Sequence, residues 1–190
     1  MKETTAKKKF MWNMAGSLCN SLSSMLLLII VNRISGESRG GFFALAYSTA
    51  QLLFSVGGFE IRPVQSTDIK NKFTFNQYFT SRMLNCIIML ICMIGYIVVN
   101  GYTGVEALTV FWILGYRMVE AVADVYSGLF QQRERIDISG KEMLMRSGIS
   151  TITFTIILWL TDNLLYAAMT LTLTSLVIML FYDLHMKKYF

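Results

Sequence analysis

The sequence contains little charge, one proline and one histidine. Charged residues make up 15% of the 190 residues and hydrophobic residues 54%, with a mean hydropathy of +0.50. A soluble domain of this size contains about 25% charged residues, so the composition excludes an ordinary soluble domain and predicts a polytopic membrane protein. The formal net charge is +5, but the basic residues do not cluster on one soluble face. We therefore expect no nucleic-acid partner.

The sequence also lacks the residues that catalysis inside a membrane requires. His185 is the single histidine, and Cys19, Cys86 and Cys92 lie in apolar runs without the spacing of metal ligands. The sequence contains no HExxH, no GxSxG and no glycine-rich phosphate loop. Glu120 and Asp124 have no second acidic motif with which to hold a metal. We therefore expect no enzymatic activity, no metal site and no cofactor.

Six apolar runs of about the length that crosses a bilayer follow one another along the chain. They predict an all-α integral membrane protein, a single domain with transmembrane helices at about 10–31, 41–61, 78–99, 105–131, 144–160 and 164–184. Residues 32–40 are expected to form a loop, and Pro63 to end the second helix. The charged stretch 131–146 is expected to form the loop before the fifth helix. The first run has no cleavage site, which favours an uncleaved helix over a signal peptide.

Lys and Arg are distributed unevenly between the two sides of this six-helix arrangement. Of the 17 Lys and Arg, 14 fall in the terminal segments and in the second and fourth loops, beginning with Lys2. Arg33 and Arg39 are the 2 that fall on the other side, and Arg117 lies within the fourth helix. Cytoplasmic loops carry the excess of Lys and Arg. We therefore predict that both termini are cytoplasmic.

The fourth apolar run carries Arg117, Glu120 and Asp124 within the predicted crossing. Helical geometry places them within about 60° of one another, with Arg117 roughly 15 Å deep. Charges at that depth normally face protein or water, so we expect these side chains to line a polar cavity together with Asn20 and Gln51. Arg117 is expected to pair with Glu120, one turn away, which leaves Asp124 as an uncompensated acid suited to a proton relay or cation site. Alternatively, all three charges only join this helix to its neighbours.

Several short motifs occur in an order that resembles a known family. They are the Asn and Gly-Ser of the first helix, Arg-x-x-Gly after it (Arg33), and Ala-Gln-Leu-Leu in the second helix (Gln51). Arg-x-x-Gln-x-x-Asp (Arg62, Gln65, Asp68) and Tyr-x-x-x-Arg (Tyr78, Arg82) follow. Over roughly residues 10–160 the chain resembles the bacterial polysaccharide and O-antigen flippases of the multidrug/oligosaccharidyl-lipid/polysaccharide exporter superfamily.

The resemblance implies a function, a location and a partner. Such transporters move an undecaprenyl-pyrophosphate-linked oligosaccharide across the bacterial cytoplasmic membrane, for polysaccharide and cell-envelope synthesis. They enclose a polar cavity between two six-helix lobes, and this chain supplies the helices of one lobe. The resemblance therefore implies a second lobe, either joined covalently to this one in a longer polypeptide or supplied by a separate chain.

The same resemblance suggests what two groups of residues do, and it leaves alternatives open. A pyrophosphate requires cations, so Arg33, Arg62 and Arg82 are candidate anion contacts, although topology or headgroup anchoring explains them equally well. Arg62, Gln65 and Asp68 are expected to form a cytoplasmic cap on the second helix. The alternative to a transporter is a membrane anchor or scaffold for envelope-polysaccharide assembly, or a non-functional truncated lobe.

Overall fold

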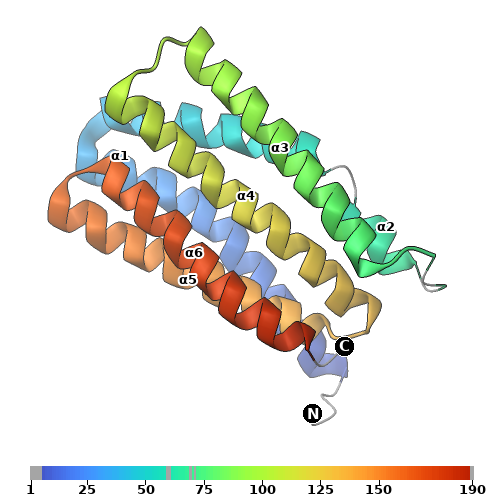
Figure 1. Ribbon diagram of the computed structural model, residues 1–190. Coiled ribbons are helices and arrows are strands. Elements are labelled where there is room, and N and C mark those ends of the chain that lie inside the picture. Colours follow the sequence, from blue (N-terminus) through green and yellow to red (C-terminus); the bar gives the residue numbers. More distant parts are fainter. Residues whose placement is uncertain (1–5, 59–60, 69, 71, 189–190) are drawn as a thin grey trace.

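The computed structural model describes residues 6–58, 61–68, 70 and 72–188, and every regular element in this part of the chain is a helix. In order they are α1 (Ala6–Gly58), α2 (Ile61–Thr67), α3 (Phe75–Val99), α4 (Gly104–Gln132), α5 (Ile136–Thr161) and α6 (Leu164–Lys187). The long helices run side by side along one common direction (Figure 1). Lys2 of the predicted basic head and residues 59–60 of the predicted second helix lie outside the described residues.

Helix α1 folds back on itself at Gly36, so that its two arms, residues 6–35 and 37–58, correspond to the first two predicted helices. Gly36 has φ 83° and ψ 171°, a region of backbone geometry open essentially to glycine alone. The expected loop at 32–40 is wrong, because only Gly36 leaves helical geometry. The bend is tight: a Cβ added to Gly40 would lie 2.7 Å from the Asn32 Oδ1.

Two other segments expected to be loops are helical. Pro63 does not end a helix but lies in the first turn of α2, where a missing N–H costs no hydrogen bond. Helix α5 begins at Ile136 rather than at 144, and only residues 133–135 connect it to α4. The polar side chains of this first part of α5 are buried: Asp137, Ser139, Glu142 and Arg146 are each at most 2% exposed.

The bundle has two distinct ends. At the terminal end, Lys9 Nζ donates to the Glu134 carbonyl at 3.0 Å, and Lys187 Nζ lies 3.8 Å from the centre of the Phe75 ring. The residues nearest both termini therefore lie here with α2 and the α4–α5 turn (Figure 1). At the kink end, which contains Gly36, Arg39 Nη1 lies 2.9 Å from Asp162 Oδ1. The predicted alternation of loops between two ends is thus seen; which end is cytoplasmic stays a prediction.

The interior changes character between these ends. Toward the kink end it is an apolar core that includes Leu27, Phe43, Met93, Ile113 and Phe154, each fully or almost fully buried. Toward the terminal end, polar and charged side chains are buried among apolar ones such as Val125 and Phe130, and the polar ones come mainly from α4 and α5. Such groups are stable in an interior only when they have partners. The candidate site therefore lies in this half of the bundle.

The outer surface is apolar along several helices. Exposed hydrophobic side chains include Leu84, Ile88 and Ile91 of α3, Ile152 and Trp159 of α5, and Val177 and Phe181 of α6. Within the described residues, four helical segments are long and apolar enough to cross a membrane: Ala6–Ser55, Phe75–Val99, Ile136–Thr161 and Leu164–Lys187. Helix α4 is not one of them, and it packs against every other helix of the bundle. These features indicate a membrane protein, while the six crossings stay a prediction.

Candidate functional site

Helix α4 brings its charged stripe into the interior of the bundle. Arg117 is 3% exposed and Glu120 7%, and the two side chains form an ion pair one helical turn apart. The expectation that these two face protein agrees with their burial. Two charges in an apolar bundle are stable only when geometry and hydrogen bonds compensate for lost hydration, and both arms of α1 supply such contacts.

Both arms of α1 contact the Arg117–Glu120 pair. From the first arm, the Asn20 amide donates to Glu120 Oε1 at 2.8 Å. From the second arm, the Tyr47 ring lies under the Arg117 guanidinium, whose central carbon is 4.4 Å from the ring centre. A cation over an aromatic face is attracted by the ring quadrupole, more strongly when water is excluded. The Tyr47 hydroxyl donates to Ser24 Oγ at 2.9 Å and so joins the two arms.

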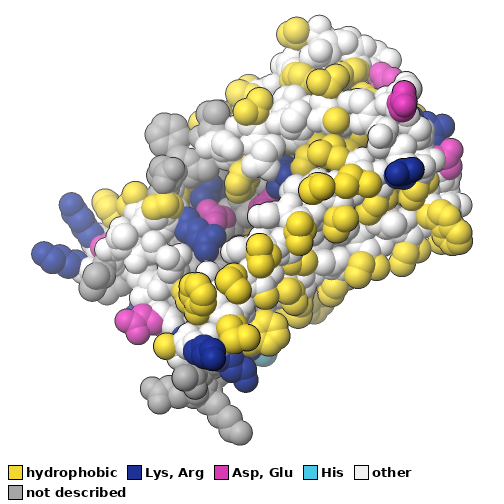
Figure 2. Space-filling model, turned by 180° about the vertical axis from the view of Figure 1, so that it is seen from behind, with side chains coloured by type: hydrophobic (Ala, Val, Ile, Leu, Met, Phe, Trp, Pro, Cys, Tyr) yellow, Lys and Arg dark blue, Asp and Glu magenta, His cyan; other side chains and the backbone are white. Residues whose placement is uncertain are grey.

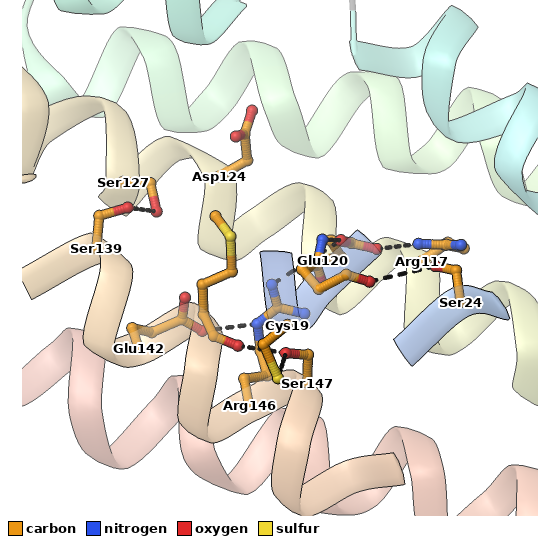
Figure 3. Close-up of polar contacts among 12 residues, drawn as sticks. Cys19, Ser24, Arg117, Glu120, Asp124, Ser127, Ser139, Glu142, Arg146 and Ser147 are labelled. Carbon is orange, nitrogen blue, oxygen red and sulfur yellow. Dashed lines mark hydrogen bonds and ion pairs between the residues drawn. The ribbon is translucent and has the colours of Figure 1, made fainter. Parts of the chain in front are cut away.

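Helix α5 extends the network with two residues that the sequence analysis did not select. Arg146 Nε donates to Glu142 Oε1 at 2.6 Å, and Arg146 Nη2 lies 4.0 Å from Glu120 Oε1. Figure 3 shows Arg146 between the two carboxylates, with Cys19 and Ser147 beside it. The i,i+4 spacing of Glu142 and Arg146 is typical of a helical ion pair. It was missed because the residues were assigned to a loop.

Asp124 is not the uncompensated acid that the sequence predicted. Its Oδ2 accepts from Arg82 Nη2 at 2.9 Å, and its Oδ1 accepts from Arg62 Nη1 at 3.2 Å. Asp124 points away from the Glu120 group toward α3 (Figure 3). The two arginines lie on α2 and α3, 62 and 42 residues away in the sequence. The sequence of α4 alone therefore does not show that the Asp124 charge is compensated.

The three arginines proposed as anion contacts do not form one group. Arg82 is 1% exposed and is held by Asp124, while Arg62 bonds the same carboxylate and has a side chain 28% exposed. Arg33 is exposed near Gly36, at the opposite end of the bundle. Arg62, Arg82 and Asp124 together carry a net charge of +1, so this triad remains attractive to an anion.

Two adjoining hollows lie against the charged network. The larger, of about 470 Å³, is lined by Asn20, Gln51, Arg117 and Glu120, together with Ser21, Ser24, Tyr47, Ser48 and Phe54. The smaller, of about 190 Å³, is lined by Arg62, Asp124 and Arg146, and it shares Asn20, Phe54 and Glu120 with the larger. Figure 2 shows acidic and basic side chains in a hollow, with hydrophobic side chains along the surface beside it. We call the two hollows together the polar cavity.

The motif at 62–68 joins helices at the terminal end. The Asp68 carboxylate accepts from the backbone N–H of Lys72 and Phe73 at 2.9 and 3.0 Å, and from the Tyr78 hydroxyl at 3.0 Å. The two backbone bonds hold the pKa of the Asp68 carboxyl below its usual range. Gln65 is fully buried against α4, where a Cβ on Gly128 would lie 2.4 Å from Gln65 Oε1. The three motif residues thus connect α2 to α3 and α4.

Comparison of the chain with protein-family models, curated proteins and solved structures found no match. The resemblance to polysaccharide flippases therefore rests on the sequence motifs and stays a prediction.

The chemistry of the cavity is that of a binding site for polar groups. Hydroxyl and amide side chains line one part, and guanidinium and carboxylate groups line the other. Among the described residues no three His, Cys, Asp or Glu side chains are placed to hold a metal ion together. His185 is exposed near the end of α6, away from the residues that line the cavity.

Proposed function

We propose that the chain is one lobe of a membrane transporter that moves a lipid-linked oligosaccharide across the bacterial cytoplasmic membrane. The observation that supports the proposal is a cavity lined by hydroxyl, amide and charged side chains inside a bundle whose outer surface is apolar. Polar groups that face lipid carry a high free-energy cost. In membrane proteins they therefore line internal cavities, where they contact a ligand or water.

The lining of the cavity suits the two polar parts of such a ligand. Sugar hydroxyls bind to small polar side chains, and Ser21, Ser24, Ser48 and Gln51 line the larger hollow. A pyrophosphate binds to guanidinium groups, and Arg62 lines the smaller hollow. Since Arg82 also holds Asp124, Arg62 is the arginine that can leave this carboxylate for a phosphate without leaving the carboxylate unpaired.

The proposal requires a second lobe to close the cavity. Transporters built from two parallel repeats place the binding site between the repeats. The second lobe is then a further segment of the same polypeptide or a separate chain. In either case it would cover the face of α1 that carries Ser21, Ser48 and Gln51, where Ser21 and Ser48 are exposed in this chain.

The experiment compares Arg62→Ala with Arg33→Ala in cells whose own copy of the gene has been deleted. Surface glycan and the amount of protein in the membrane are measured together. Arg62→Ala is expected to lower surface glycan about tenfold or more, the effect of losing one charge-assisted hydrogen bond, with protein abundance unchanged. Arg33→Ala is the matched control and should change neither. A parallel loss of glycan and protein in Arg62→Ala would assign Arg62 to folding and contradict the proposal.

One observation favours the alternative of an anchor or scaffold. Arg117, Glu120 and Asp124 each have an ion-pair partner within the chain, as expected if they only join helices. A scaffold requires no water in the cavity. Cavity substitutions that keep the fold, such as Ser48→Leu, should therefore leave surface glycan unchanged in a scaffold and lower it in a transporter.

A further inference from the structure

Helix α6 carries one acidic residue in the interior of the bundle, and neither the cavity nor the proposed function involves it. Asp183 is 1% exposed, near the end of α6. Both of its carboxylate oxygens are buried, and neither accepts a hydrogen bond. A buried carboxylate normally receives several donors or a cation. Asp183 receives neither.

The groups around Asp183 come from the two helices packed against α6 and from α6 itself. Glu142 and Arg146 of α5, Tyr126 of α4 and the neighbouring Tyr182 act on it electrostatically. The one cation among them, Arg146, already donates to Glu142 at 2.6 Å. The second oxygen of Glu142, Oε2, is also buried without a donor. Arg146 is thus bonded to Glu142 and leaves both Asp183 oxygens without a donor.

Asp183 differs from the other buried charged side chains among the described residues, because each of those has an ion-pair partner. They are Arg82, Arg117, Glu120, Asp137, Glu142 and Arg146. The network of Arg117, Glu120, Arg146, Glu142 and Asp183 would hold two positive and three negative charges if all were ionised. One bound proton makes the network neutral. It also supplies an O–H donor beside the carboxylate oxygens that accept no hydrogen bond.

We propose that Asp183 and Glu142 hold one proton between them and form a proton-binding site buried between α5 and α6. Two neighbouring carboxyl groups out of contact with water do not both ionise, because like charges repel strongly there. A proton fits better than a metal ion, because the Arg146 guanidinium on Glu142 would repel a second cation. The site depends neither on the transported substrate nor on a second lobe.

The position of Arg146 connects this site to the polar cavity. Arg146 lies between Glu142 and Glu120, and its Nη2 is 4.0 Å from Glu120 Oε1. Loss of the shared proton adds a negative charge on the α6 side of Arg146. The guanidinium would then be drawn toward α6 and away from Glu120, which lines both hollows of the cavity.

The test is infrared spectroscopy of the purified full chain in lipid, titrated with pH. The carbonyl stretch of a protonated carboxyl group is expected at neutral pH and should disappear at alkaline pH. Asp183→Asn should remove it at neutral pH. Asp162→Asn, at an exposed position in the α5–α6 turn, is the matched control and should keep it. A neutral-pH band that survives intact in Asp183→Asn would overturn the proposal.

A second variant and a chemical label keep the test decisive even if Asp183→Asn fails to fold. In Glu142→Gln, Arg146 becomes free to pair with Asp183, so the carbonyl band should be lost at neutral pH. A band that persists in this variant would show a proton on Asp183 alone and contradict the shared site. A hydrophobic carbodiimide, which reacts with protonated buried carboxyl groups, should label the Asp183 or Glu142 peptide, found by mass spectrometry. Labelling of neither would overturn the site.

Discussion

Arg117 and Asp124 of α4 each have their own set of partners. Arg117 bonds Glu120 and lies over the Tyr47 ring, so its partners are on its own helix and on α1. Asp124 has arginine partners on α2 and α3. Ion pairs therefore fix α4 to α2 and α3 through Asp124 and to α5 through Glu120, and Arg117 joins it to α1 through the Tyr47 ring.

At the Asp124 position we expect a coupling that a double-mutant cycle can measure. Asp124→Asn leaves Arg62 and Arg82 close together without their shared carboxylate, and Arg82 is almost fully buried. The loss should be about 2 kcal/mol, the usual contribution of hydrogen bonds to a charged group. Adding Arg82→Gln should recover part of it, because the repulsion between the neighbouring Arg62 and Arg82 guanidinium groups is then removed. The measurement is thermal unfolding of all four proteins in detergent micelles.

The cycle also tests the earlier sequence-based hypothesis. If Asp124 were an uncompensated acid in the cavity, Asp124→Asn would raise stability or leave it unchanged. Simple addition of the two single effects in the double variant would show that the carboxylate and Arg82 do not interact in solution.

Among the elements, α1 depends most on a single residue. Gly36→Ala places a side chain at φ 83° and ψ 171°, a conformation that costs non-glycine residues about 1–3 kcal/mol. We expect that loss of stability and a weaker Arg39–Asp162 contact, since Arg39 follows the bend. The measurement is thermal unfolding followed by circular dichroism.

Gly41→Ala is the matched control for the α1 bend. Gly41 is helical, and a Cβ there would meet no atom within 4 Å. Alanine is favoured over glycine in a helix by about 1 kcal/mol, so Gly41→Ala should stabilise the chain. Equal effects of the two substitutions would show that the two arms of α1 do not bend at Gly36.

Helix α5 shows that polar residues can form a buried helix where neighbouring helices supply partners for them. Helix α5 begins eight residues before the predicted start because Ser139 Oγ donates to Ser127 Oγ of α4 at 2.8 Å and Glu142 bonds Arg146. Inside the bundle these polar groups exchange hydrogen bonds with water for hydrogen bonds with one another. A charged stretch can therefore be part of a buried helix. Likewise, Gly16 and Gly140 let α1 and α5 approach so closely that a Cβ on Gly16 would lie 2.2 Å from the Gly140 carbonyl oxygen.

For the molecule as a whole, we expect neighbouring residues of one helix to face different surroundings, one facing the water of the cavity and the next facing lipid. Gln51 lines the polar cavity, whereas Leu52 is 67% exposed on the apolar surface. In a chain without Cys19, Cys86 and Cys92, Gln51→Cys should react with a membrane-impermeant thiol reagent. Leu52→Cys should not react, because lipid excludes the reagent. Equal labelling of both positions in intact membranes would contradict the lipid-facing assignment.

The two ends of the bundle should lie on opposite sides of the membrane. Reporter fusions in the 133–135 turn and at the C-terminus are expected to report the cytoplasm, because the excess of Lys and Arg lies at that end. Fusions at Gly101 and Asp162 should report the outside. A cytoplasmic signal from Gly101, with the C-terminal fusion unchanged, would show that α3 and α4 do not cross the membrane as a pair.

The sequence by itself determined most of the long helices and the burial of Arg117 and Glu120. Apolar runs gave the bounds of α3, α4 and α6 to within three residues, because the length and hydrophobicity of a helix are local properties. The stripe of Arg117 and Glu120 followed from helical periodicity alone. Only the tertiary structure decided which charged partners come from other helices. Arg62 and Arg82 reach Asp124 from distant segments, and Asp183 comes to lie beside Glu142 and Arg146 because α6 packs on α5. The charge state of a buried group depends on such long-range neighbours, which no local pattern of residues contains.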